Sequence, residues 1–216
     1  MDLNKVKKGK LVLIVGPSGS GKGTIIKNLR DRHPDWVYPI SCTTREIREG
    51  EVKDQVYHFI SEEEFKKGIS DGRFLEYAIV HGTQYYGTDK KEIIDAVLDG
   101  KVVVREVDIQ GFHSIKKVFE EGFGVGFDGL GLGQLLSIFI EAKDLDELRR
   151  RIATRGKLPE DEVERRMESA RKEIALASDC DYRVVNEYGK VEEAVNQVEN
   201  FICGDLNGRC GCDECG

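Results

Sequence analysis

Hydrophobic positions along the chain fall into short uninterrupted runs that alternate with segments of helical spacing. The run 11–15 predicts a strand buried on both faces, and later runs predict strands at 102–107, 137–140 and 182–185. The intervening segments repeat apolar residues every three or four positions, which predicts helices. Strands that alternate with helices favour an α/β fold with a mostly parallel central sheet and helices on its faces.

Capping residues mark where the helices begin. Asp89 with Glu92, and Asp144 with Glu147, have the spacing of capping boxes, and Pro159 is typical of the first turn of a helix. The pattern changes between residues 37 and 88. Short β-like pieces at 56–60 and 74–80 there surround one helix that begins after residue 61. We therefore expect a small β-rich lobe at 37–88, inserted into a core formed by 8–36 and 89–202.

A glycine-rich loop follows the first strand and precedes a helix, which is the context of a phosphate-binding loop. Its residues are Gly16, Pro17, Ser18, Gly19, Ser20, Gly21, Lys22, Gly23 and Thr24. Glycines let the backbone N–H groups wrap a phosphate, and the helix N-terminus and Lys22 add positive charge. Such loops usually place Ser or Thr directly after the lysine to reach Mg²⁺. Here Gly23 stands between Lys22 and Thr24, so the sequence leaves undecided whether Thr24 contacts the metal.

Further motifs follow in a fixed order. They are Ser41-Cys42-Thr43-Thr44-Arg45-x-x-Arg48-x-Gly50-Glu51, Tyr57-His58-Phe59, Phe74-Leu75-Glu76, Tyr85-Tyr86-Gly87-Thr88, Val107-Asp108-Ile109-Gln110-Gly111, Leu148–Gly156 with Arg166, and Val184-Val185-Asn186. In order and spacing they resemble the guanylate kinase family over residues 8–120 and 137–202. The resemblance implies a P-loop three-layer α/β fold over a single domain, 1–216, with a GMP-binding lobe at 37–88 and a helical lid at about 149–166.

Guanine presents N1–H and N2–H₂ donors beside its O6 acceptor. Glu76 can accept from the donors and the Ser41 hydroxyl can donate to O6, whereas adenine would leave the carboxylate unpaired. By resemblance, Thr88 and Asp108 complete the guanine side.

The GMP phosphate needs cationic and hydroxyl donors. Arg45 and Arg48 are planar forks suited to a phosphate dianion, and Tyr57 and Tyr86 can donate to its other oxygens. Tyr85 is the alternative to Tyr86, because this segment is one residue longer than the usual family form.

Three arginines carry the predicted lid. Arg151 and Arg155 share one helix face, and Arg166 lies on the next helix. With Lys22 and Arg45, the resemblance assigns them to charge stabilisation during transfer, although an arginine-rich helix is more often a solvated surface. The remaining arginines, Arg149, Arg150 and Arg165, are expected to be surface residues. Asn186 matches a position near the donor adenine, and a structural capping role is the alternative.

The resemblance implies transfer of the γ-phosphate of ATP–Mg²⁺ to GMP, which gives ADP and GDP. The accepting phosphate is already ionised near neutral pH, so no general base is required. Two alternatives stay open: a kinase for another nucleoside monophosphate or a sugar phosphate, and a non-catalytic interaction module of the same family. Such modules typically lose loop or lid residues that this chain keeps.

Composition narrows the choice of partners. The 216 residues are 39% hydrophobic with a net charge of −7, which argues against a nucleic-acid binder. The first aliphatic run is too short for a membrane span or a signal peptide, so we expect a cytoplasmic protein without membrane partners. A monomer or a homodimer is expected.

Two segments depart from the family pattern. The glycine-rich insertion 121–134 also carries apolar residues, and it predicts either a self-packed surface loop or an oligomer contact. The tail 203–216 holds Cys203, Cys210, Cys212 and Cys215. Four thiolates could bind Zn²⁺ tetrahedrally, and free or redox-active thiols are the alternative.

Overall fold

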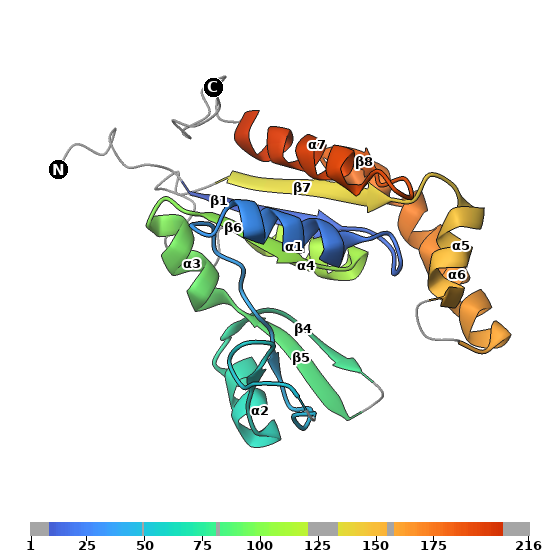
Figure 1. Cartoon of the computed structure of the whole chain (residues 1–216). Coiled ribbons are helices and arrows are strands. Elements are labelled where there is room, and N and C mark those ends of the chain that lie inside the picture. The colour runs from blue at the N-terminus through green and yellow to red at the C-terminus, as the bar shows by residue number, and fades with distance from the viewer. Residues whose placement is uncertain (1–8, 49, 81–82, 121–133, 155–157, 205–216) are drawn as a thin grey trace. The chain divides into compact units, whose positions relative to one another are not determined.

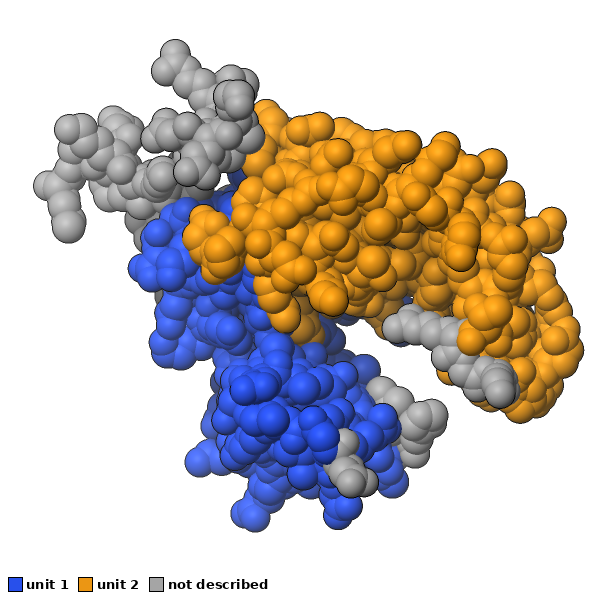
Figure 2. Space-filling model, in the orientation of Figure 1, with its two compact units in different colours: residues 1–11, 36–103, 110–135 blue, residues 12–35, 104–109, 136–216 orange. Residues whose placement is uncertain are grey.

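The computed structural model describes residues 9–48, 50–80, 83–120, 134–154 and 158–204. The chain divides into two compact units, coloured blue and orange in Figure 2. The blue first unit contains residues 1–11, 36–103 and 110–135; the orange second unit contains 12–35, 104–109 and 136–216. Each unit is described by itself below.

The central sheet has four strands in the order β6-β1-β7-β8 (Figure 1). Their bounds are β1 Lys10–Val15, β6 Val102–Glu106, β7 Gln134–Glu141 and β8 Tyr182–Val185. Every residue of β1 is buried, as predicted for a strand covered on both faces. β7 and β8 run parallel. The expected α/β fold with a parallel central sheet is therefore confirmed.

β7 begins three residues before the predicted start at 137. The backbone N–H of Gln134 donates to the Gly9 carbonyl at 3.2 Å, so pairing with the residue just before β1 extends the strand. A local hydrophobic pattern cannot reveal this, because Gln134 itself is polar and exposed. At the other edge, Val37 forms a parallel bridge with Val103.

Helices α1 (Lys22–Arg32) and α7 (Val191–Gly204) lie side by side in the second unit (Figure 1). α7 also packs against β8 and buries the apolar residues Ala194, Val195, Val198 and Ile202. Arg32, at the end of α1, donates to Asn196 at 2.8 Å and to Glu199 at 2.5 Å. These contacts join the helix of the phosphate loop to the last helix.

The remaining helices of the second unit form a hairpin, α5 (Leu145–Thr154) and α6 (Glu160–Ala175). Their shared core contains Leu148, Ile152, Val163, Met167 and Ala170. The 3₁₀ helix η2 (Ala177–Asp179) then leads to β8. The Asp144 carboxylate accepts from the Glu147 backbone N–H at 2.7 Å, which confirms the predicted cap at the start of α5.

The first unit contains a mixed sheet in the order β3-β2-β5-β4. Its strands are β2 Cys42–Thr43, β3 His58–Phe59, β4 Phe74–Val80 and β5 Gln84–Asp89. β2 and β3 are parallel, and the other pairs are antiparallel. Helix α2 (Glu62–Ser70) packs Phe65 on Phe74 with ring centroids 4.2 Å apart, and the Ser61 hydroxyl caps it. The predicted small β-rich lobe is thus present.

Two strand predictions in this lobe need correction. The piece 56–60 contains a strand at His58–Phe59 alone, because Asp54 adopts a positive φ of 62° and its N–H pairs with the Tyr57 carbonyl. β5 was not predicted as a strand, since glycine interrupts its pattern. Gly87 is required there because a Cβ would lie 2.9 Å from the Phe65 ring.

Helices α3 (Lys90–Leu98) and α4 (Ile109–Glu120) complete the elements. The Asp89 carboxylate accepts from the Lys91 N–H at 2.9 Å and so caps α3, as predicted. None of the helices in the described ranges is long and apolar enough to cross a membrane.

Candidate active site

The phosphate loop of the second unit depends on glycine at positions where no other residue fits. Gly16 follows β1 with φ 141°, and a Cβ there would lie 2.2 Å from the carbonyl oxygen of Ile140 on β7. Gly21 is the N-cap of α1 with φ 96°, and its Cβ would lie 2.2 Å from the Asn186 amide nitrogen. The loop can therefore lie close to β7 and to the residue that follows β8.

Lys22 organises the loop from inside. Its ammonium donates to the Gly16 carbonyl at 2.6 Å and to the Pro17 carbonyl at 3.1 Å, and it lies 3.6 Å from a Glu106 carboxylate oxygen. The side chain is buried. This places a positive charge at the N-terminus of α1, where the helix dipole also favours an anion.

Arg151 and Asn186, which the sequence assigns to the lid and to ATP, both contact the loop. The buried Asn186 amide donates to the Ser20 carbonyl at 2.8 Å. The Arg151 guanidinium donates to the same carbonyl at 3.3 Å, to the Asn186 carbonyl at 2.8 Å and to the Glu147 carboxylate. The structure thus brings Arg151, Asn186 and the loop together, and it gives Asn186 the structural contact that was its alternative role.

The other predicted donor-side residues are placed as follows. Thr24 is exposed on the first turn of α1, and the buried Ser20 hydroxyl has no hydrogen-bond partner within the described part of the chain. Arg166 lies on α6 and donates to Glu162 at 2.7 Å. Arg155 lies outside the described residues.

One acidic residue near the loop escaped the sequence interpretation. Glu173 lies on α6, and its Oε2 is buried without a hydrogen-bond partner in the described ranges. Burial raises the pKa of Glu173; the Lys22 charge lowers it and the Asp108 charge raises it. Glu173 belongs to a helix rich in charged residues, so nothing in the sequence distinguished it from a solvated glutamate.

The predicted phosphate-binding residues of the first unit form a cluster. The Arg45 guanidinium lies 5.3 Å from the centre of the Tyr57 ring, and the Tyr57 and Tyr86 rings are 5.7 Å apart. A hydrogen bond with Tyr86 contributes to the raised pKa of Arg45, after the larger contribution of Glu51. Tyr85 instead packs on Phe65 with ring centroids 5.2 Å apart. The structure therefore places Tyr86, and not Tyr85, beside Arg45.

The predicted guanine-binding residues divide between the units. Glu76 on β4 lies opposite Thr88 on β5, and the buried Thr88 hydroxyl donates to its carboxylate. Ser41 is half-buried just before β2. Arg48, which is predicted to bind the phosphate, is exposed in the following loop. Asp108 belongs to the second unit, whereas Ser41, Glu76 and Thr88 belong to the first.

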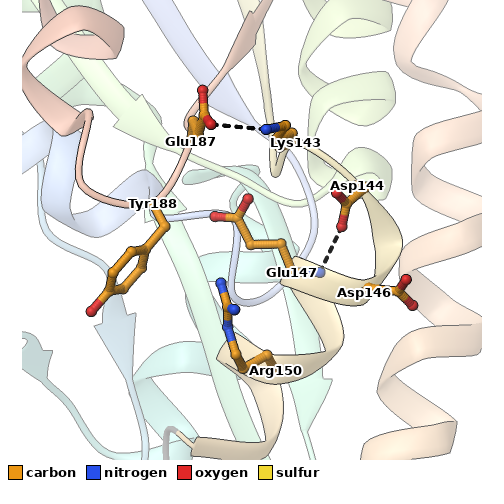
Figure 3. A pocket seen from close by; sticks show the side chains of 7 residues that line it. All are labelled: Lys143, Asp144, Asp146, Glu147, Arg150, Glu187 and Tyr188. Carbon is orange, nitrogen blue, oxygen red and sulfur yellow. Dashed lines mark hydrogen bonds and ion pairs between the residues drawn. The ribbon is translucent and has the colours of Figure 1, made fainter.

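The structure also reveals a pocket, formed by the start of α5 and residues that follow β8, which the sequence did not predict (Figure 3). Its volume is about 340 Å³, and its lining residues are Lys143, Asp144, Asp146, Glu147, Arg150, Glu187 and Tyr188. Arg150 is exposed, as expected, and its guanidinium lies 5.5 Å from the centre of the exposed Tyr188 ring. Arg149, likewise expected at the surface, pairs with Glu160 and Glu164 of α6, whereas Arg165 is exposed and pairs with Glu162 on its own helix.

The cysteines hold no recognisable metal site in the described ranges. Cys203 is half-buried in the last turn of α7, and Cys210, Cys212 and Cys215 lie outside the described residues. No group of three or more His, Cys, Asp or Glu side chains in those ranges could hold a metal ion. The insertion 121–133 also lies outside them, and residue 134 begins β7.

Comparisons with known proteins agree with this arrangement. The family model for guanylate kinase matches residues 8–204. A guanylate kinase from Clostridium tetani is 40% identical over 93% of this chain and 88% of its own length; one from Nostoc is 38% identical over 91% and 90%. The crystal structure of guanylate kinase from Anaplasma phagocytophilum is similar with a TM-score of 0.66 and 25% identity, covering 94% of this chain and 89% of that one.

Proposed function

The chain belongs to the guanylate kinase family, and we propose which of its residues bind ATP, bind GMP and stabilise the phosphate during transfer. Guanylate kinase activity transfers the γ-phosphate of ATP to GMP, and the family implies both nucleotides as substrates. This excludes the non-catalytic module and the kinases for other acceptors.

On the donor side, the loop Gly16–Thr24 binds the triphosphate of ATP. The buried Lys22 ammonium and the N–H groups at the start of α1 support this assignment, because both favour phosphate oxygens. Arg151 contributes positive charge from α5, and Arg155 and Arg166 complete the lid. Asn186 holds the loop through the Ser20 carbonyl, next to the pocket that we assign to the adenine and ribose of ATP.

The family implies magnesium together with ATP. Mg²⁺ takes oxygen ligands and commonly binds through substrate phosphates with one or two protein groups. The exposed Thr24 hydroxyl on the first turn of α1 fits this donor requirement and is the protein ligand that we propose. When bound, the ion neutralises charge on the phosphates that take part in the transfer.

On the acceptor side, Arg45, Arg48, Tyr57 and Tyr86 bind the phosphate of GMP. The clustering of Arg45 with both tyrosine rings supports this assignment. The acceptor phosphate is ionised, so the work of these residues is orientation and charge neutralisation rather than proton transfer.

Glu76 recognises the base, with Ser41, Thr88 and Asp108. The hydrogen bond from Thr88 fixes the Glu76 carboxylate, which can then accept from the N1–H and N2–H₂ of guanine. This partly buried hydrogen bond is the observation that carries the proposal of GMP selectivity.

We expect Glu76→Gln to weaken the preference for GMP. An amide offers the guanine donors one acceptor oxygen and an opposing NH₂, so kcat/KM for GMP should fall by about tenfold or more while KM for ATP stays unchanged. The measurement is steady-state kinetics with GMP and AMP as acceptors. Glu63→Gln, on the exposed face of α2 in the same lobe, is the matched control. An unaltered ratio of GMP to AMP would contradict the assignment.

The remaining proposals concern partners and location. The net charge of −7 supports a protein whose partners are the two nucleotides rather than nucleic acid or a membrane. ATP and GMP are intracellular metabolites, which supports a cytoplasmic location. A monomer or a homodimer remains our proposal, and the mass of the protein in solution, measured with and without residues 122–133, tests it.

Zinc bound by the four tail cysteines stays a separate hypothesis.

A further inference from the structure

Glu51 accepts hydrogen bonds from both arginines that we assign to the GMP phosphate, Arg45 and Arg48. The assignments above give Glu51 itself no role in catalysis or binding. Its Oε1 accepts from Nη2 of Arg45 at 2.8 Å, and its Oε2 accepts from Nη1 of Arg45 at 2.8 Å. The same Oε2 accepts from the backbone N–H of Arg48 at 2.8 Å. One carboxylate therefore fixes the Arg45 side chain and the backbone of Arg48 at once.

The hydrogen bonds of Arg45 to Glu51 and to the Glu46 carbonyl leave one edge of its guanidinium for Tyr86 and an anion. A guanidinium has five N–H groups. Nη1 donates one hydrogen to Glu51 and the other to the Glu46 carbonyl at 2.7 Å, and Nη2 donates one of its two hydrogens to Glu51. Nε–H and the second Nη2 hydrogen lie on the same edge of the plane, and this is the fork that a phosphate binds in bidentate form.

Aromatic rings fix the plane of the guanidinium. Its central carbon lies 5.3 Å from the centre of the Tyr57 ring and 5.4 Å from that of Phe59. Arg45 is only 7% exposed, so it has little freedom to rotate. Hydrogen bonds from Arg45 and from the Arg48 backbone hold the pKa of Glu51 at about 2, and the carboxylate thus stays ionised over the working range of an enzyme.

We propose that Glu51 is a positioning residue for the acceptor phosphate, which directs the Nε edge of Arg45 and the backbone of Arg48 toward GMP. The inference rests on the proposed role of Arg45 and Arg48 in binding that phosphate. Glu51 does not touch the phosphate itself. It acts by holding the Arg45 guanidinium in the orientation in which its Nε edge can donate to the phosphate.

A simpler view makes the opposite prediction. If Glu51 were only a counter-ion, it would offset the charge of Arg45 and compete with the phosphate. Removing its charge would then strengthen GMP binding. If Glu51 positions Arg45, removing its second acceptor frees the guanidinium to turn and weakens GMP binding. The direction of the change in KM for GMP therefore separates the two.

The test is steady-state kinetics of Glu51→Gln and Glu51→Asp with GMP and ATP varied separately. We expect Glu51→Gln to raise KM for GMP by about ten- to a hundredfold, with KM for ATP and kcat nearly unchanged. Glu51→Asp keeps both oxygens and should recover part of the loss. Glu46→Gln is the control, because the exposed Glu46 side chain lies in the same segment and its backbone carbonyl is retained.

Three results would overturn the inference. One is a KM for GMP that is unchanged or lower in Glu51→Gln. Another is a loss that appears equally in KM for ATP and in the melting temperature, which would indicate a purely structural role. The last concerns Arg45→Ala: if KM for GMP is unaffected there, the proposed role of Arg45 fails and the inference fails with it. A raised KM in Arg45→Ala with a normal one in Glu51→Gln overturns this inference alone.

Discussion

Single residues set the conformation of the phosphate loop through contacts that only small or flexible side chains allow. Gly16 and Gly21 let the backbone lie against Ile140 and Asn186, where a Cβ would overlap with a carbonyl oxygen or an amide nitrogen. Lys22 then fills the loop with its ammonium on two carbonyls. Sequence spacing predicts such a loop because each of these requirements is met by a particular residue type at a particular position.

Glu173 gives a pH dependence that can be measured directly. Its pKa is raised by burial, so the native state holds the proton more tightly than the unfolded chain, and stability falls as pH rises above about 4.5. Glu173→Gln removes the ionisation. We therefore expect the melting temperature of the variant, relative to the unaltered protein, to rise as pH increases from 4 toward 8.

A matched control has the opposite sign. Glu168 lies on the same helix, and its pKa is lowered by a hydrogen bond from Lys172. Glu168→Gln should lose stability relative to the unaltered protein over the same increase in pH. Thermal unfolding followed by circular dichroism at several pH values measures both. Curves for Glu173→Gln that stay parallel to those of the unaltered protein would contradict the prediction.

Residue types that serve known chemistry could be predicted, and residues that act through others could not. Arg45, Tyr57 and Tyr86 could be predicted because they stand in the motifs that resemble the family and their donors suit a phosphate, and the structure groups them. Glu51 and Glu173 were not, because their roles depend on which charges lie beside them after folding. A sequence shows a carboxylate but not its neighbours across the fold.

At the scale of elements, the sequence predicts helix starts reliably, because the residues that form a cap are close together in the chain. The carboxylates of Asp89 and Asp144 cap their helices as predicted, and the Ser61 hydroxyl caps the helix that begins after it, because a cap involves residues two or three positions apart. Strand limits depended on tertiary pairing. β7 starts early through Gly9, and the strand at His58–Phe59 is short because a turn at Asp54 precedes it.

The cap of α2 can be tested by a single substitution. Ser61→Ala removes the acceptor for the Glu64 N–H and should lower the free energy of unfolding by about 1 kcal/mol. Ser70→Ala is the control, since the Ser70 hydroxyl returns to the Lys66 carbonyl within the helix and its loss should be nearly neutral. Urea denaturation measures both. Equal effects of the two variants would show that the cap does not stabilise this helix.

For the molecule as a whole, the family resemblance predicted the fold because several independent motifs agree in order. The regions that depart from the family, 121–134 and 203–216, are the ones for which sequence reasoning left two readings. Hydrophobic residues among glycines do not specify what they pack against, and cysteine spacing does not determine oxidation or metal binding.

The tail can be separated from the enzyme experimentally. A chain that ends at Gly204 retains α7 and every residue assigned to the two nucleotides, so kcat and KM should be unchanged. We expect elemental analysis of the untagged full chain to find zinc at trace level, with the tail cysteines reacting as free thiols. One zinc per chain that disappears on truncation would instead support the tetrahedral zinc site.

The division into units has a consequence for synthesis on the ribosome. The chain passes from one unit to the other five times, so neither unit is a continuous segment. The phosphate loop emerges early, yet Gly16 lies against Ile140 and Ser20 is held by Asn186, both made much later. The nascent chain therefore cannot assemble the proposed ATP site before translation is nearly finished, and fragments that end before residue 186 should be unable to complete it.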